Sequence, residues 1–454
     1  MKVLILAGGF GSRLWPLSTK REPKQFLPLF AHKSLLQNTI ARAKAIAEPH
    51  DIFIATQIDH KPEVVEHAID ESIPLDNVLT EPCCKNTCPA IALAFRIFLE
   101  NDPDSEQVPF LICPSDHWIE ENLMKFIALM QEAEALAKQN QIITFGVAPA
   151  YPETGYGYIQ VESQGKSCSI VEFKEKPDLA AARRYVEAGS YFWNSGMFVM
   201  SPKTFFEALK ESSSKLFAFF DRPSEAILSE FSTIEPTSFD VAVMEKVANR
   251  QMLPMTLGWS DIGSWESIYR CFPKDDDKNV VHGEGLAKES QRCLVLSETT
   301  PVVALGVSDL VIVQTEDAIL VAPRGLPDET LRSAGEGIEG KTEFRPWGSF
   351  TILSRGRHSL TKRIRIFPNK RLSLQKHQHR DEHWVIVQGT AEVTLGETTG
   401  IYYANQSLFI PKGMVHRVHN PNQTPLEIIE VQTGDSLTEE DIIRYEDDFG
   451  RVPS

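Results

Sequence analysis

The stretch that decides the fold is Val3-Leu4-Ile5-Leu6-Ala7, followed by Gly8-Gly9-Phe10-Gly11-Ser12-Arg13-Leu14. The first part is apolar at every position, which predicts a strand buried on both faces, as in a parallel sheet. The glycines that follow let the backbone approach a phosphate closely and present N–H groups to it. A dinucleotide fingerprint would need a glycine where Leu14 stands, and the Gly-Lys-Ser/Thr of a Walker loop is missing. Two interpretations of these glycines therefore remain: a phosphate-binding loop of another kind, or a plain tight turn.

The charge around this loop favours the phosphate-binding interpretation over a solvated basic loop. The chain of 454 residues has 46 Lys and Arg against 62 Asp and Glu, a net charge of −16. Residues 1–24 carry a single acid, Glu22, against Lys2, Arg13, Lys20, Arg21 and Lys24. A basic site in an acidic protein attracts a polyphosphate to one place. The overall charge also argues against a general nucleic-acid binder, because phosphate backbones need a basic face.

The first 270 residues or so alternate short apolar runs with helical patterns, which indicates a mostly parallel sheet covered by helices. The patterns predict further buried strands at residues 52–55, 110–113 and 142–145, and amphipathic helices at residues 35–47 and 89–99. In such sheets ligands bind beyond the carboxyl ends of the strands. Attention therefore falls on Gly8 to Arg13 and on Pro114-Ser115-Asp116-His117.

The pattern changes in the last third of the chain. Residues 293–296, 310–313 and 318–321 predict a small strand-rich connector, and the glycines among charged residues at 325–341 predict a linker. Beyond it, Leu360, Ile364 and Ile366 share one parity and Thr361, Arg363 and Arg365 the other, which predicts a small antiparallel barrel or sandwich. We therefore expect domains at 1–272, 273–335 and 340–454.

A histidine cluster lies in this β domain, at Gln375-Lys376-His377-Gln378-His379-Arg380-Asp381-Glu382-His383, with His416 and His419 downstream. Residues two apart on a strand share a face, so either Gln375 and His377 or His377 and His379 can point into the barrel. Imidazole suits transition metals, so the cluster predicts a metal site. Residues 355–380 also hold nine Arg and Lys and no acid, which suits either a phosphosugar or a solvated barrel face.

The N-terminal motifs resemble those of sugar-nucleotide pyrophosphorylases. Trp15-Pro16 and Lys24-Gln25-Phe26 are similar to mannose-1-phosphate guanylyltransferases in particular. Further matching motifs follow in the family's order: Glu81-Pro82, Asn86-Thr87, Glu153-Thr154-Gly155-Tyr156-Gly157, Glu175-Lys176-Pro177, Trp193-Asn194-Ser195-Gly196 and Gly258-Trp259-Ser260-Asp261. With the C-terminal part, the resemblance extends over nearly the whole chain. It is a resemblance to bifunctional bacterial enzymes that join this transferase to a mannose-6-phosphate isomerase of the type II phosphomannose isomerase family.

This resemblance implies a Rossmann-like, GT-A type α/β domain, a β-rich connector and a C-terminal cupin barrel. It also implies roles for individual residues of the transferase. Asp116 and Asp261 would hold Mg²⁺, Arg13 and Lys24 the triphosphate, and these four are the expected catalytic residues. The expected nucleotide-binding residues also include Gly8, Gly9, Gly11, Ser12, Glu81, which would accept from guanine, and Asn86. The expected sugar-phosphate residues are Gly155, Glu175, Lys176 and Asn194. One departure from the family is Lys85, which stands where an arginine is usual and lacks its planar fork.

The C-terminal motifs resemble the two cupin motifs. Gln375-x-His377, Glu382 and Gly389 fit the first motif's spacing, whereas a start at His377 leaves too short a gap to Glu382. The resemblance implies Gln375, His377, Glu382 and His416 as metal ligands. Arg380 and Arg417 are the expected phosphate-binding residues, and His379 or His383 the acid–base group. Asn369 and Asn405 replace the glycines that open the motifs, and asparagine tolerates the positive φ expected there.

The resemblance of both parts implies an enzyme that transfers GMP from GTP to mannose 1-phosphate and interconverts fructose 6-phosphate and mannose 6-phosphate. GDP-mannose would supply surface polysaccharide. The expected cofactors are Mg²⁺ for the transferase and a divalent metal such as Zn²⁺ or Co²⁺ for the isomerase. A transferase whose cupin only binds or assembles is the alternative, and a non-enzymatic sugar-nucleotide sensor is a third hypothesis. We expect a cytoplasmic homo-oligomer, a dimer, without nucleic-acid or membrane partners, since neither a targeting segment nor an apolar run of membrane-spanning length is evident.

Overall fold

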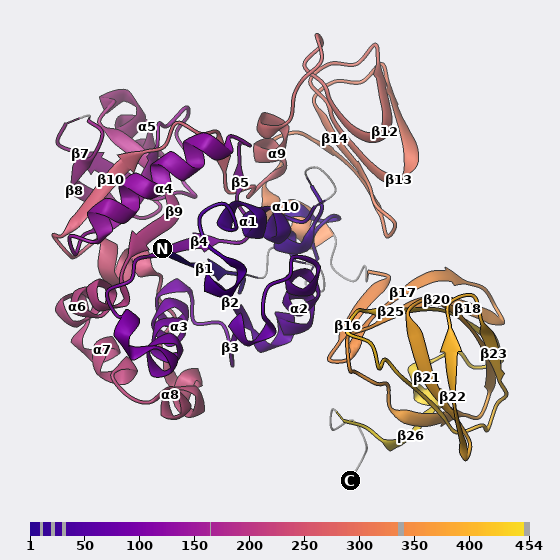
Figure 1. The fold of residues 1–454 in the computed structure, drawn as a ribbon. Coiled ribbons are helices and arrows are strands. Elements are labelled where there is room, and N and C mark those ends of the chain that lie inside the picture. The colour runs from indigo at the N-terminus through magenta and orange to yellow at the C-terminus, as the bar shows by residue number, and fades with distance from the viewer. Residues whose placement is uncertain (10–11, 20–22, 30–32, 164, 335–339, 449–454) are drawn as a thin grey trace. The chain divides into compact units, whose positions relative to one another are not determined.

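The computed structural model describes residues 1–9, 12–19, 23–29, 33–163, 165–334 and 340–448 (Figure 1). The chain forms two compact units: Met1–Val313 with Leu320–Ala334, and Gln314–Ile319 with Gly335–Ser454. Each is described by itself below. Among the described residues, no helix is long and apolar enough to cross a membrane.

A twisted α/β sheet forms the centre of the first unit, in the order β3-β2-β1-β4-β9-β6-β10-β8-β7. Its strands are β1 (Lys2–Leu6), β2 (Ile52–Gln57), β3 (Val78–Glu81), β4 (Phe110–Pro114), β6 (Ile142–Val147), β7 (Tyr158–Val161), β8 (Cys168–Lys174), β9 (Tyr191–Met200) and β10 (Arg250–Pro254). A short ribbon pairs β5 (Trp118–Ile119) with β11 (Trp259–Ser260). The expected parallel pairing is confirmed for β1 with β2 and β4, while β9 runs antiparallel to both β4 and β6.

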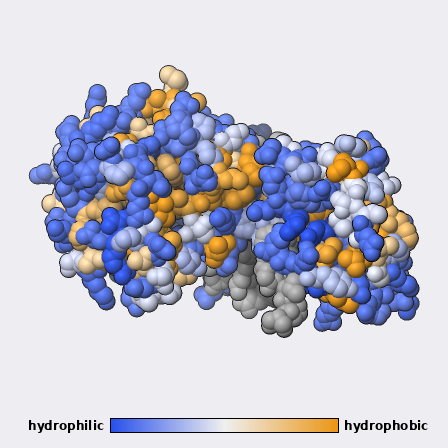
Figure 2. Space-filling view, turned by 60° about the horizontal axis from the view of Figure 1, so that its bottom comes forward, coloured by the Kyte–Doolittle hydropathy of each residue, from blue (hydrophilic) through white to orange (hydrophobic). Residues whose placement is uncertain are grey.

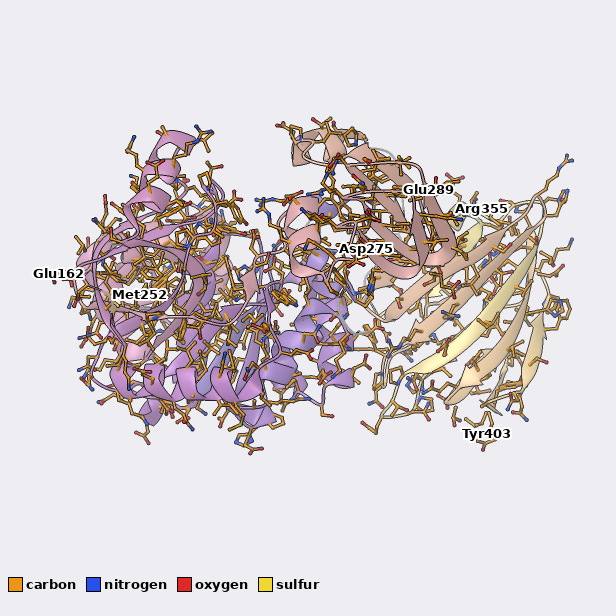
Figure 3. All side chains as sticks on the ribbon, turned by 90° about the horizontal axis from the view of Figure 1, so that it is seen from above. Glu162, Met252, Asp275, Glu289, Arg355 and Tyr403 are labelled. Carbon is orange, nitrogen blue, oxygen red and sulfur yellow. The ribbon has the colours of Figure 1, made fainter. Side chains whose placement is uncertain are left out.

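Helices cover both faces of this sheet because its strands are apolar on both parities. In β1, Val3 and Ile5 join one core cluster, with α1 and α2, and Leu4 joins the opposite one, with α3. The helices are α1 (Leu35–Ala43), α2 (Lys61–Asp70), α3 (Thr87–Asn101), α4 (Leu123–Ala137), α5 (Leu179–Ala188), α6 (Pro202–Ser212), α7 (Ser214–Phe220), α8 (Ser224–Glu230) and α9 (Trp265–Cys271). Met252 of β10 lies within this core, fully buried (Figure 3).

The β-rich connector packs against the glycine loop's flanks. It consists of β12 (Val280–Lys288), β13 (Leu294–Leu305), β14 (Leu310–Gln314) and β15 (Ile319–Pro323). Leu294 and Leu296 of β13 share a core cluster with Leu14 and Leu17, which follow the glycines. Strand β12 runs parallel to β13, so the connector is not a simple hairpin. It therefore supports the N-terminal loop from behind.

The predicted linker at 325–341 holds more structure than its glycines suggest. Helix α10 (Asp328–Ala334) lies inside it, and Leu331 is buried in the same cluster as Leu14. The prediction was wrong for this part of the segment. Leu331 is buried against distant residues of this cluster, and no local sequence pattern reveals such a contact.

The second unit is an antiparallel β-barrel made of two facing sheets. One sheet has the order β16-β17-β18-β25-β20-β23 and the other β22-β21-β24-β19-β26. The strands are β16 (Thr342–Arg345), β17 (Gly348–Arg355), β18 (Ser359–Ile366), β19 (Leu374–His377), β20 (Arg380–Gln388), β21 (Thr390–Leu395), β22 (Thr398–Tyr403), β23 (Ser407–Ile410), β24 (His416–His419), β25 (Leu426–Gly434) and β26 (Ile442–Glu446). The expected positive φ is confirmed at Asn369 (56°) and Asn405 (71°).

The barrel's interior is apolar at one end and polar at the other. Ile364, Ile386 and Ile428 fill the apolar end, together with Val393 and Val418 from the facing sheet. Further along the same strands the inward positions become polar: Lys362, Arg380, Glu382, Glu430 and Gln432 are all buried. Outward side chains of the barrel, such as Tyr403, are exposed (Figure 3). On the face of the molecule that Figure 2 shows, the surface is mostly hydrophilic and is interrupted by apolar patches.

Candidate active sites

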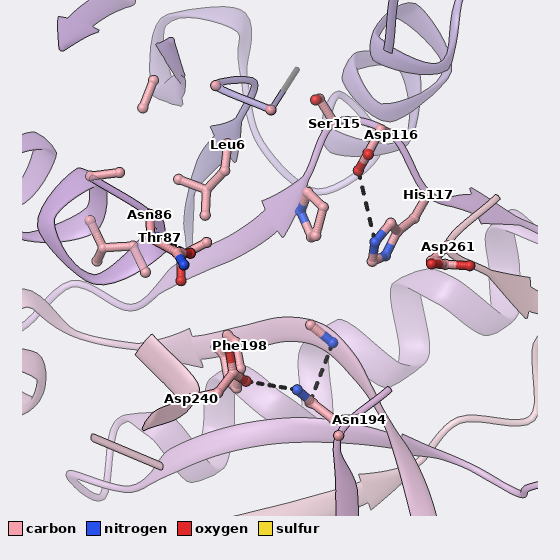
Figure 4. A pocket seen from close by; sticks show the side chains of 18 of the residues that line it. Leu6, Asn86, Thr87, Ser115, Asp116, His117, Asn194, Phe198, Asp240 and Asp261 are labelled. Atoms are coloured by element: carbon pink, nitrogen blue, oxygen red, sulfur yellow. Dashed lines mark hydrogen bonds and ion pairs between the residues drawn. The ribbon is translucent and has the colours of Figure 1, made fainter. Parts of the chain in front are cut away.

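A pocket of about 560 Å³ opens where the strands of the first unit end (Figure 4). Gly8 and Gly9 follow β1, Glu81 ends β3, and Asp116 follows β4. The carboxyl ends of three strands of one sheet therefore meet at this pocket. Buried Gln25 fixes the glycine loop by donating from Nε2 to the Gly9 carbonyl at 2.9 Å. This volume is typical of a small-molecule site.

Two carboxylates and one lysine form the charged centre of this pocket. The Lys24 Nζ lies 3.0 Å from Asp116 Oδ2 and donates to the Asp261 carbonyl, so one cation joins both loops. Burial alone would raise the pKa of Asp116, but the charge of Lys24 lowers it below its usual value. The Tyr156 hydroxyl donates to Asp261 Oδ1 at 2.7 Å and orients that side chain. The two carboxylates supply the hard oxygen ligands that Mg²⁺ prefers, and they fit the expected ion.

The expected sugar residues line the opposite wall, where Figure 4 shows Asn194 beside Asp240. Asn194 donates from Nδ2 to Asp240 Oδ1 at 2.8 Å and accepts from Thr144 Oγ1 at 2.9 Å. The Glu175 Oε1 lies 3.3 Å from Lys176 Nζ. A Cβ at Gly157 would stand 2.7 Å from Glu175 Oε2, so only glycine leaves that carboxylate its place.

Asp240 is a site residue that the sequence reasoning missed. Burial and the neighbouring charge of Glu175 raise the pKa of Asp240 to about 7. Its signal in the sequence was one acid inside an otherwise apolar run, Phe239-Asp240-Val241-Ala242-Val243-Met244. Such an acid needs a partner inside the protein, and the Asn194 amide is that partner.

The third wall carries Glu81 and the start of α3. Glu81 is buried and lines the pocket, and burial raises its pKa to about 8. Asn86 caps α3 by accepting from the Thr87 N–H at 2.8 Å, and its own φ is 70°. Lys85, the departure from the family pattern, donates to the Ser232 carbonyl at 2.6 Å and serves as a structural anchor.

The pocket thus brings together Gly8, Gly9, Glu81, Asn86, Asp116, Gly155, Glu175, Lys176, Asn194 and Asp261, with Lys24 in contact. Arg13 lies exposed in the short turn Ser12–Leu14 and is not among the lining residues. Gly11 lies outside the described residues.

A second cluster of ligating side chains lies inside the barrel. Ligand atoms of His377, Glu382 and His416 lie within 4.8 Å of one another, all buried. Gln375 Nε2 stands 3.4 Å from His377 Nε2, and Gln375 pairs in register with His416. His416 Nδ1 lies 3.0 Å from the Met414 carbonyl, and its buried Nε2 has no hydrogen-bond partner among the described residues. A histidine fixed at Nδ1 with an unused Nε2 fits a metal ligand.

Glu382 is held from several sides. His377 Nε2 lies 3.0 Å from Oε1, and Arg380 Nε and Gln432 Nε2 donate to the same oxygen. Burial alone would raise the pKa of Glu382, but the hydrogen bond and charge of His377 lower it. Trp384 Nε1 donates to Glu382 Oε2 at 3.1 Å and lies 3.2 Å from a second buried acid, Glu430. Burial and the charge of Glu382 raise the pKa of Glu430 to about 8.

The expected acid–base and phosphate residues of the barrel fall mostly outside this cluster. Strand β19 ends at His377, so His379 turns away, half-exposed, with Nδ1 2.8 Å from Asp441 Oδ1. His383 is exposed and packs on the ring of Phe409 at 4.7 Å. Arg417 pairs with Glu446 at 3.1 Å and does not line the barrel pocket. Of these expected residues only Arg380 lies beside the cluster, whereas His379, His383 and Arg417 do not line the barrel pocket.

The fold and the two sites define a nucleotidyltransferase joined to a barrel that carries a candidate metal site. Comparison with known families agrees: residues 2–278 match the nucleotidyl transferase family, 283–326 a mannose-phosphate isomerase/GMP-like beta-helix domain and 336–447 the C-terminal domain of mannose-6-phosphate isomerase.

Similar proteins extend over the whole chain. A mannose-1-phosphate guanylyltransferase of Salmonella muenchen is 38% identical over 98% of both chains. The alginate biosynthesis protein AlgA of Pseudomonas putida is 38% identical over 99% of this chain and 96% of that protein. A crystal structure from Thermus thermophilus, described as a mannose-1-phosphate geranyltransferase, has a TM-score of 0.66 and 29% identity over 73% of this chain and 97% of that one. The chain belongs to the mannose-1-phosphate guanylyltransferase family whose members carry a C-terminal mannose-6-phosphate isomerase domain.

Proposed function

We propose that the first unit makes GDP-mannose from GTP and mannose 1-phosphate, and that the barrel interconverts fructose 6-phosphate and mannose 6-phosphate. The observation that carries the first half is the joining of Asp116 and Asp261 by Lys24 across the pocket from Asn194 and Glu175. GDP-mannose would then supply a surface polysaccharide, as the roles of the xanthan and alginate relatives suggest.

In the transferase, a phosphate oxygen of mannose 1-phosphate attacks the α-phosphorus of GTP, and the bond to pyrophosphate breaks. No protein nucleophile is required, so the residues act by positioning and by stabilising charge. Lys24 would neutralise charge that develops between the α-phosphate and the leaving pyrophosphate. Asp116 and Asp261 would hold Mg²⁺, which offsets the triphosphate's charge when bound. Gly8 and Gly9 would offer backbone N–H groups to the phosphates.

Base and sugar would occupy opposite ends of the pocket. Ionised Glu81 would accept hydrogen bonds from the N–H edge of guanine. Glu175 and Asn194 would bind mannose hydroxyls, with Asp240 holding the Asn194 amide in place at 2.8 Å. Lys176, beside Glu175, would contact the sugar's phosphate.

In the barrel, Gln375, His377, Glu382 and His416 would hold a divalent metal, which we propose to be Zn²⁺ or Co²⁺. When bound, the metal would polarise the substrate's carbonyl and hydroxyl oxygens. Arg380 and Gln432 would keep the carboxylate of Glu382 oriented through their hydrogen bonds to Oε1. His379 and His383, the expected acid–base candidates, are not among the residues that line the pocket beside this cluster.

GTP and the three hexose phosphates are all metabolites of the cytoplasm, so we propose a cytoplasmic enzyme. We also propose a homodimer without nucleic-acid or membrane partners. The net charge of −16 supports the absence of a nucleic-acid partner.

The isomerase half is tested by stripping the purified protein of metal and adding back Zn²⁺, Co²⁺, Mn²⁺ or Mg²⁺ separately. We expect turnover of fructose 6-phosphate to depend on the added ion. If no ion gives turnover while GTP and mannose 1-phosphate still yield pyrophosphate, the barrel is a binding or assembly module.

A further inference from the structure

A buried lysine stands at an inward position of the barrel wall. Lys362 of β18 shares its parity with Leu360 and Ile364, which fill the interior, and its side chain is only 10% exposed. In the sheet it pairs with Glu430 of β25. A lysine is rarely enclosed in this way without a charged partner. The buried position of Lys362 therefore indicates that its charge interacts with an anionic group inside the barrel.

The carboxylate within ion-pair distance of Lys362 comes from an exposed turn. Glu439 begins the short turn Glu439–Asp441, and its Oε1 lies 3.6 Å from Lys362 Nζ. The other oxygen, Oε2, lies 3.6 Å from Arg444 Nη2 of β26. Both distances exceed those of direct hydrogen bonds, and the Glu439 side chain is 54% exposed. One loosely held carboxylate thus stands between two cations.

A third cation faces the same place. Arg345 lies over the ring of Phe350 at 5.5 Å, and Lys362 lies over that ring at 4.6 Å. Arg345 also pairs with Glu343, so it is less available than Lys362.

These cations line one pocket together with two of the four expected metal ligands. Lys362, Arg345, Arg444 and Glu439 share it with Gln375 and Glu382. A ligand in this pocket would reach the cluster with one end and the cations with the other. A hexose phosphate has this form, with reacting oxygens at C1 and C2 and a dianionic phosphate at C6.

We propose that Lys362 and Arg444, assisted by Arg345, form the anchor for the phosphate of the barrel's hexose phosphate substrate, and that Glu439 occupies this anchor until the substrate displaces it. The inference rests on the proposed isomerase function. A phosphate dianion offers more charge and more acceptor oxygens than one carboxylate. Glu439 itself is half-exposed and both of its ion-pair distances are 3.6 Å, so displacing it costs little.

The two halves of this proposal predict opposite effects. Lys362→Met should raise the KM for fructose 6-phosphate about tenfold or more, because a charge-assisted contact is lost. Glu439→Gln should lower that KM about two- to fivefold, because the competing carboxylate loses its charge. Inorganic phosphate should inhibit the Gln variant more strongly than the wild type and the Met variant less.

Arg363→Gln is the matched control. Arg363 neighbours Lys362 on β18 but points outward, exposed, and pairs with Glu427 at 3.2 Å. The Arg363→Gln substitution removes one positive charge from the outer face of the same strand, so the KM of this variant for fructose 6-phosphate should stay at the wild-type value. Lys362→Arg should restore most of the affinity. Urea unfolding of the same full-length proteins checks that the barrel is folded in all four variants. GDP-mannose synthesis, which reports on the first unit, should be unchanged in all four.

An unchanged KM in Lys362→Met would overturn the anchor, and a raised KM in Glu439→Gln would overturn the role of Glu439. If the wild type shows no isomerase turnover with any metal, the proposed function fails and calorimetry decides the anchor alone. Fructose 6-phosphate is then titrated into full-length protein saturated with GDP-mannose, which fills the transferase pocket. Weaker binding in Lys362→Met but not in Arg363→Gln supports the anchor, and equal binding overturns it.

Discussion

The buried Glu81 predicts that nucleotide binding depends on pH. Burial raises the pKa of Glu81 to about 8, whereas guanine's N–H edge needs the ionised carboxylate as acceptor. At pH 7 about one molecule in ten would carry Glu81 ionised, so binding must first release a proton at about 1.4 kcal/mol. The affinity should therefore fall about fiftyfold between pH 8 and pH 6, with a slope that approaches tenfold for each pH unit below pH 7.

GDP-mannose is the suitable ligand, because its diphosphate does not titrate between pH 6 and pH 8. Calorimetry at pH 7 in buffers of different ionisation enthalpy should show the release of about 0.9 protons per nucleotide bound. Glu81→Gln should bind more weakly at pH 8 and lose the pH dependence. Equal wild-type affinity at pH 6 and pH 8, or proton uptake on binding, would refute the assignment of Glu81.

Three further predictions concern the first unit. Lys24→Met should lower the kcat for GDP-mannose synthesis about 10²- to 10³-fold, since Lys24 joins both carboxylate loops; a loss below tenfold would contradict its role. Asp240→Asn keeps an acceptor for the Asn194 amide and should change the KM for mannose 1-phosphate by less than about threefold. Asp240→Ala leaves that amide unpaired and should raise the KM about tenfold. Equal effects of the two variants would argue against a role of Asp240 in positioning Asn194. Leu296→Ala should destabilise the first unit by about 2–5 kcal/mol in urea unfolding and reduce GDP-mannose synthesis more than isomerase turnover, because Leu296 packs in the cluster that contains Leu14.

Much of the first unit could be predicted because its strands are short, apolar and followed by chemically distinctive turns. The apolar runs at 52–55, 110–113 and 142–145 all fall within strands, and the helical pattern at 35–47 contains α1. The antiparallel direction of β9 could not be predicted, because strand direction depends on distant partners and leaves no local pattern.

In the barrel, the alternation of inward and outward side chains along a strand predicts more than the apolar positions, because it also places the polar residues between them. The alternation of Leu360, Ile364 and Ile366 already implied that Lys362 points inward. Parity then failed at His379, because it holds only while a strand continues and β19 ends at His377. Spacing alone could not show where that turn falls.

We propose that one chain carries two separate active sites, and two variants test this on the full-length protein. Asp116→Ala should abolish GDP-mannose synthesis and leave isomerase turnover at the wild-type rate. His416→Ala should abolish metal-dependent isomerase turnover and leave GDP-mannose synthesis intact. Loss of both activities in either variant, or survival of GDP-mannose synthesis in Asp116→Ala, would contradict two separate sites.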